Sequence, residues 1–210
     1  LGNTADSYRA VPEIKINYNK ALGEYLEFNL DSEVAHFDNT LDTAPTATRF
    51  HVAPTLAVPL RAAWGELVAE TTLFQTVYQQ DNVEGTDLKE DVERTLGQAR
   101  LYGALYFERD KSWFSDDMSM TLEPKIQYLY TSYEDQTAIG FYDSTPLLTD
   151  VEGLFRGQEF TGLDRISDNN QITLGATTRM LDKNNREQFV LSVGQIFYLE
   201  DNKVKLVLPF

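Results

Sequence analysis

Apolar and polar residues alternate most regularly between Met118 and Tyr130. Every second position there is apolar, with Pro124 in the same register, and most positions between are polar. Because successive side chains of a strand point to opposite faces, this pattern predicts a strand with one apolar and one polar face. The segment exceeds the roughly 5–6 residues usual in soluble sheets and reaches the about 9–11 residues of a tilted membrane-spanning strand.

A long stretch without periodicity, residues 132–169, follows this segment. Such loops are uncommon inside compact soluble domains. A barrel strand followed by a long exterior loop accounts for both the alternation and the loop that comes after it.

The alternation recurs along the whole chain, which predicts about eight or nine strands. Pro54 and Pro59 interrupt one of the segments, and proline lacks the donor that a ladder needs, so bulges or a sheet edge are expected there. The other alternating segments cover about residues 11–21, 26–34, 47–61, 66–80, 98–108, 171–181 and 188–199.

Short and long connections also alternate. Long polar connections are expected at about 38–46, 81–97 and 132–169, with short turns between them. This rhythm is typical of outer-membrane barrels, which have short periplasmic turns and longer exterior loops. The predicted fold is therefore all-β, an antiparallel transmembrane β-barrel, with residues 1–210 forming a portion of one barrel domain. A soluble β-sandwich or propeller would show a similar alternation.

Aromatic residues near the segment ends resemble the girdles that barrels place at the membrane interfaces. They are Tyr25, Phe37, Trp64, Tyr78, Trp113, Phe114, Tyr128 and Tyr130.

Composition narrows the function classes. The net charge of −15 argues against a nucleic-acid partner, which needs a basic surface. The sequence has no cysteine, so it holds no disulfide or thiolate site. The N-terminal residues lack the basic and apolar regions of a signal peptide, so we expect an exported precursor to have lost its signal, or the chain to be an excerpt.

Catalytic motifs are missing from the sequence: it has no nucleophile elbow, no phosphate-binding glycine loop and no His-Glu-x-x-His. His36 and His51 could bind a metal across a hairpin, but ordinary wall or loop histidines are the simpler interpretation. We therefore expect no enzyme activity, no metal and no cofactor.

Residues 143–165 combine glycines, aspartates and arginines within the long loop. Two interpretations stay open, and they are compatible: an ordered loop held by Asp–Arg contacts, and a constriction inside a barrel.

The same region carries a resemblance to a known family. Residues 142–150 (YDSTPLLTD), 153–156 (GLFR), 162–166 (GLDRI) and 170–175 (NQITLG) are similar to the LptD (Imp/OstA) family of outer-membrane lipopolysaccharide-assembly proteins. Residues 105–109 (LYFER), 122–125 (LEPK) and 192–198 (SVGQIFY) match it in the same order. The similarity is strongest from about Ala99 to Tyr198.

The resemblance implies a middle portion of a barrel of about 26 strands in the outer membrane of a Gram-negative bacterium. It implies non-enzymatic insertion of lipopolysaccharide into the outer leaflet, with outer-membrane lipid around the barrel. The implied protein partners are the plug lipoprotein LptE and, through an N-terminal domain outside this chain, a periplasmic lipopolysaccharide-bridge protein.

Candidate site residues follow from this interpretation. We expect Glu123, Lys125 and Gln127 on the lumen wall. A further set is expected in an exterior loop that packs into the lumen or against the plug: Asp143, Arg156, Asp164 and Arg165. The alternatives are a soluble β-rich carbohydrate-binding module or enzyme, and a general porin. Since lipopolysaccharide is anionic, an acidic chain needs bridging divalent cations or hydrogen bonds to sugars to bind it.

Overall fold

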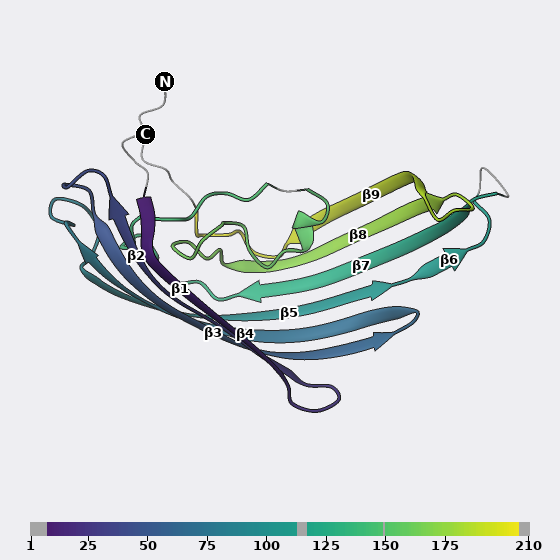
Figure 1. The fold of residues 1–210 in the computed structure, drawn as a ribbon, viewed down its shortest axis with the longest axis horizontal. Helices are drawn as coiled ribbons and strands as arrows, with labels where there is room; N and C mark the ends of the chain where they lie inside the picture. Colours follow the sequence, from purple (N-terminus) through teal and green to yellow (C-terminus); the bar gives the residue numbers. More distant parts are fainter. Residues whose placement is uncertain (1–7, 113–116, 149, 206–210) are drawn as a thin grey trace, which may run out of the picture.

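The computed structural model describes residues 8–112, 117–148 and 150–205, which form one antiparallel sheet (Figure 1). A 3-10 turn, η2 (Gly153–Phe155), lies in the long loop. The strands are β1 (Tyr8–Ala21), β2 (Glu27–Asn39), β3 (Thr46–Ala62), β4 (Gly65–Asp81), β5 (Asp91–Leu105), β6 (Phe107–Arg109), β7 (Ser119–Thr131), β8 (Asn169–Leu181) and β9 (Glu187–Tyr198).

Each strand pairs with its neighbour in sequence, in the order β1-β2-β3-β4-β5-β7-β8-β9, and β6 extends β5 along β7. Among the described residues β1 and β9 do not pair, so the sheet is open. The predicted all-β antiparallel fold is confirmed. The open sheet is consistent with a portion of a barrel. Over the same residues, no helix has the length and apolar content to cross a membrane.

The sheet is strongly curved, and residues 132–168 lie over its concave face (Figure 1). Along β7 the two faces differ in burial: Ile126 and Tyr128 are exposed, whereas Gln127 and Leu129 are buried under the loop. The apolar register therefore faces outward and the more polar register faces inward. This is the reverse of a soluble sheet, in which the apolar face packs into the core. A large apolar surface of this kind marks contact with another molecule or a membrane.

Three expectations about the strands need correction. The connection predicted at 81–97 is shorter than expected. β5 already begins at Asp91, and it pairs with β4 from Gln79 back to Gly65. The predicted bulges at the prolines are also wrong: β3 continues through both, and its register with β4 is the same on either side of Pro54. Finally, Phe37 and Tyr78 are 2% and 0% exposed, so they are not interfacial girdle residues. Trp113 and Phe114 lie outside the described residues.

Candidate functional site

The inner loop, residues 132–168, is a hairpin folded back along itself. Its two limbs meet at the bridge between Pro146 and Phe160, and the Leu147 amide donates to the Glu159 carbonyl at 2.9 Å. Gly162 adopts φ +62°, a left-handed conformation that glycine reaches at little cost. A side chain at this position would also collide with Asp143, which explains why a glycine stands there.

Asp164 joins the two limbs of the inner loop. Its Oδ2 accepts hydrogen bonds from the backbone amides of Tyr142, Asp143 and Ser144 at 2.7, 2.6 and 3.2 Å. In return, Ser144 Oγ accepts from the amides of Asp164 and Arg165, both at 3.1 Å. These bonds pair buried backbone amides with side-chain acceptors 20 to 22 residues away. They hold the two limbs of the loop together.

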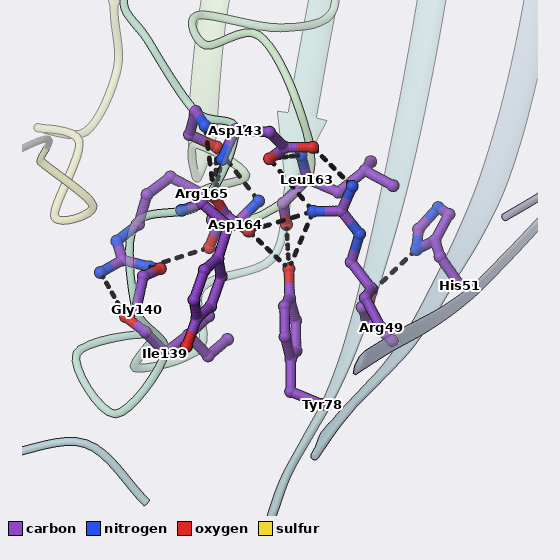
Figure 2. A network of polar contacts seen from close by, with 12 residues as sticks. Arg49, His51, Tyr78, Ile139, Gly140, Asp143, Leu163, Asp164 and Arg165 are labelled. Carbon is purple, nitrogen blue, oxygen red and sulfur yellow. Dashed lines mark hydrogen bonds and ion pairs between the residues drawn. The ribbon is translucent and has the colours of Figure 1, made fainter. Parts of the chain in front are cut away.

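Arg49 of β3 connects the sheet to the loop and is completely buried (Figure 2). Its Nε donates to Glu33 on β2 at 2.9 Å. Its Nη1 donates to Asp164 at 3.0 Å, and its Nη2 donates to Asp143. The guanidinium also lies 4.6 Å from the ring centre of Phe37. One wall arginine therefore binds carboxylates from both limbs of the loop.

Two neighbouring wall residues complete this contact. The hydroxyl of Tyr78 donates to Asp164 Oδ1 at 3.1 Å. Arg94 donates to the backbone carbonyls of Leu163 and Asp164 at 2.6 and 3.1 Å. Carbonyl groups of a loop need partners when they are buried, and the wall supplies them.

A further contact holds the start of the loop. Gln80 Oε1 accepts from the Gly140 amide at 2.8 Å and from the Tyr142 hydroxyl at 2.7 Å. The ring of Tyr142 lies 5.1 Å from that of Tyr8 and 5.4 Å from that of Phe37, between centroids. The inner loop is thus attached to β1, β2, β3, β4 and β5.

The two loop carboxyl groups titrate differently. Burial would raise the pKa of Asp143, but the hydrogen bonds and charge of Arg49 outweigh burial and lower it. Burial, together with the charge of Asp143, raises the pKa of Asp164 to about 6. Both groups are mainly ionised at neutral pH, and the network therefore pairs fixed charges.

No metal site emerges from the described ranges, which contain no group of three or more histidine, aspartate or glutamate residues able to hold an ion. His36 and His51 instead bond the hydroxyls of Thr48 and Thr76 at 2.9 and 2.8 Å. They are wall residues of the sheet.

Three of the four loop residues singled out from the sequence lie together. Asp143 and Asp164 meet at Arg49, and Arg165 donates to the Ile139 carbonyl at 2.7 Å (Figure 2). Arg156 lies apart: it is 42% exposed and bonds Asp150 at 3.4 Å.

The three predicted wall residues all lie on the concave face. Glu123 accepts from Arg179 of β8 at 2.7 Å, and Gln127 accepts from Arg100 of β5 at 2.7 Å. Lys125 reaches the loop, with its Nζ 3.3 Å from Glu152. That this face lines a lumen stays a prediction.

A second attachment lies at the other end of the loop, where η2 meets the wall. Gly175 of β8 and Gly194 of β9 pair with one another. A Cβ on Gly175 would lie 2.8 Å from the Phe155 ring, and one on Gly194 would lie 2.6 Å from Leu154. The paired glycines therefore form the recess into which these two side chains fit.

Sequence reasoning missed the wall residues that receive the loop, above all Arg49, Tyr78, Gln80 and Arg94. One indication was available. Arg49 lies in the register opposite the exposed Phe50, where alternation places a side chain on the inner face.

Comparisons with known proteins agree with one another. The family model described as "LptD: LPS transport system D" matches residues 1–209. The LPS-assembly protein LptD of Pseudoalteromonas atlantica is 62% identical over 204 residues, which cover 97% of this chain and 27% of that relative. The LPS-assembly protein LptD of Shewanella frigidimarina is 44% identical over 208 residues, covering 98% of this chain and 27% of the relative. The chain thus spans about a quarter of these relatives' length and belongs to the LptD family.

Proposed function

We propose that the full-length protein is a non-enzymatic, outer-membrane component of lipopolysaccharide transport that delivers lipopolysaccharide to the outer leaflet. Membership of the LptD family supports this proposal, as does the name LPS-assembly protein that the relatives carry. The curved antiparallel sheet, with an apolar convex face and a polar concave face, has the character expected of a barrel wall in lipid.

In this proposal the concave face lines the barrel lumen, with Glu123, Lys125 and Gln127 on its wall. These side chains bond other polar groups of the concave face or the inner loop, as residues of a polar lumen would. The convex face meets outer-membrane lipid.

The inner loop is proposed to be a fixed part of the lumen. The observation that carries this idea is the contact of the buried Arg49 with Asp143 and Asp164. Both carboxylates accept hydrogen bonds from this arginine, so each charge that the docked loop brings to the wall has a partner.

Arg156 is assigned a different role. It is half-exposed and takes no part in the Arg49 network, so it is the loop arginine free to contact the plug lipoprotein LptE. The lipopolysaccharide-bridge protein is proposed to act through the N-terminal domain of the relatives' longer chain.

Two single variants of the full-length protein test these roles. Arg165→Ala removes bonds that hold the loop, and we expect less lipopolysaccharide at the cell surface at an equal amount of barrel in the membrane. Arg156→Ala leaves the loop in place and should reduce co-purification of LptE. A protein that carries both substitutions tests the two roles together. If its surface lipopolysaccharide and its association with LptE are both unchanged, the loop has neither role.

A further inference from the structure

The convex face of the sheet carries an apolar groove of about 790 Å³, within the range of volumes usual for ligand sites. The groove crosses β3, β4, β5, β7 and β8. Its apolar side chains belong to the exposed register, which faces away from the inner loop. They are Leu60, Leu67, Leu105, Ile126 and Leu174.

One cross-strand row of residues runs along this groove. Leu60 pairs with Leu67, and Leu67 pairs with Gly103. Gly103 in turn pairs with Ile126, and Ile126 pairs with Leu174. Four branched apolar side chains therefore stand in line, and the middle position of the row has no side chain. This leaves a notch between Leu67 and Ile126.

In the part of the chain that the structure describes, nothing requires a glycine at position 103. Its backbone is not left-handed. An added Cβ would lie 3.5 Å from Ile126 Cγ2 and 3.7 Å from Leu67 Cδ1, which are ordinary contact distances. A glycine inside a strand weakens it, and it often marks a place where a ligand approaches the backbone closely. Gly103 therefore indicates a molecule that packs into the notch from outside the sheet.

The row has the length and direction of a lipid chain. It covers five neighbouring strands, and four strand spacings of about 4.8 Å make about 19 Å. It starts beside the short β3–β4 turn, and short turns face the periplasm in outer-membrane barrels. Because the strands of such barrels tilt by about 35–45°, the row would rise by about 12 Å from the periplasmic interface. The hydrocarbon of one leaflet is about 15 Å thick, half of the roughly 30 Å core.

The turn end of the groove has the residues that a lipid headgroup needs. Arg61 lines it and is 62% exposed in its side chain. Its nitrogen atoms lie 3.8 Å from Glu27 and 3.7 Å from Glu66, too far for close hydrogen bonds, so the guanidinium has donors free for a phosphate. Trp64 lines the same end and is 69% exposed, as aromatic residues at a membrane interface are.

We propose that the groove binds a glycerophospholipid of the periplasmic leaflet, with one acyl chain packed against Gly103 and the phosphate at Arg61. The inference rests on the proposed function, because it requires the convex face to lie in the membrane. It adds one specific lipid site to a surface that otherwise contacts lipid without selection.

Native mass spectrometry of the full-length protein tests the site. The protein is released from tetraethylene glycol monooctyl ether, and dioleoyl phosphatidylglycerol or dioleoyl phosphatidylethanolamine is titrated into it. We expect the first phospholipid to bind about 10-fold more tightly than those that follow. Gly103→Leu fills the notch and should weaken this first binding about 3- to 10-fold. Arg61→Gln should weaken it about 2- to 3-fold.

Two further variants keep the test independent of folding. Gly103→Ala adds a methyl group for which the sheet has room, and it should weaken the first binding less than Gly103→Leu does. Ala99→Leu is the matched control, because Ala99 is exposed on the same face of β5 but does not line the groove. It should bind lipid as the wild type does. Folding of each variant is checked by the shift between folded and unfolded bands on a gel.

Three results would overturn the proposal. The first is equal affinity for all phospholipids in the wild type, and the second is the same first affinity in Gly103→Leu as in Ala99→Leu. The third is a second protein chain or a lipopolysaccharide molecule that is retained in place of the phospholipid and lost in Gly103→Leu.

A failure of the proposed function would be seen in a different variant. Leu101 is exposed on the convex face and lies outside the groove. If the convex face lies in the membrane, Leu101→Arg should lower the unfolding temperature in phospholipid vesicles, whether or not the groove holds a lipid. An unchanged temperature would contradict the membrane location itself, whereas loss of the tight lipid alone contradicts only the site.

Discussion

Arg49 and Asp164 are both completely buried and form an ion pair at 3.0 Å, although 115 residues separate them in the sequence. Arg49 belongs to the wall and Asp164 to the inner loop. Their pairing is one of the contacts that hold the loop on the concave face. Arg49 and Asp164 also depend on each other, because removing one of them leaves the charge of the other buried without compensation.

Replacing Arg49 with methionine should release the inner loop. Glu33, Asp143 and Asp164 would lose their shared cation, and breaking a buried pair from one side costs about 3–5 kcal/mol. Limited proteolysis of the full-length protein would show faster cleavage within residues 132–168 than in the wild type.

Arg156→Ala is the control for this variant. Arg156 pairs only with the exposed Asp150 in the described parts of the chain, and surface pairs contribute about 0–1 kcal/mol. Cleavage should stay at the wild-type rate. A loop that is equally protected in Arg49→Met would contradict the role assigned to the network.

The strands could be predicted because alternation is a local property of the sequence. The pattern from Met118 to Tyr130 differs from β7 by one residue at each end. The prediction of a connection at 81–97 was wrong because the local pattern there is ambiguous: the spacing of Val83, Leu88, Val92 and Leu96 also fits a helix or a loop. Pairing with β4 makes the residues from Asp91 onward a strand instead.

The wall residues that bind the inner loop could not be predicted in the same way. Asp143 and Asp164 stood out because they lie among glycines and arginines within one loop. Their partner Arg49 is distant in sequence, and only the sheet order places it beneath them. Which inner-face residue a loop reaches depends on tertiary packing.

Gly162→Ala should weaken loop docking by two effects. The left-handed backbone becomes strained, at a cost of about 1 kcal/mol or more. The added Cβ would also lie 2.7 Å from the backbone oxygen of Asp143, which has little room to move. Hydrogen exchange of the loop amides should therefore accelerate.

Gly85→Ala is the control for left-handed strain outside the inner loop. Gly85 has φ +76°, but nothing lies within 4 Å of its Cβ position, so the substitution adds strain without a collision. It should leave exchange of residues 132–168 unchanged. Equal acceleration by both variants would show that the contact with Asp143 is unimportant.

Mild acid should not release the inner loop. The pKa of Asp164 is raised to about 6, compared with about 3.9 for an ordinary aspartate, so protonation favours the docked state as pH falls through this range. Asp143 has a lowered pKa, and the stability that it contributes is lost only as pH falls below about 4 and through its docked value. Exchange protection, corrected for the intrinsic rate, should be as high at pH 5 as at pH 7.5. Release between these values would mean that docking requires an ionised Asp164.

An arginine on the convex face should destabilise the protein in lipid. Ile126 lies near the middle of β7 and is 53% exposed, so the proposed barrel places it near the bilayer midplane. A charge there costs about 2–4 kcal/mol in barrels of this class. The unfolding temperature of the full-length protein in phospholipid vesicles should be lower in Ile126→Arg than in the wild type. It is followed by the shift between folded and unfolded bands on a gel.

Leu148→Arg is the control, because Leu148 is 88% exposed on the inner loop, away from lipid. An unchanged unfolding temperature in Ile126→Arg would contradict the proposal that the convex face lies in the membrane.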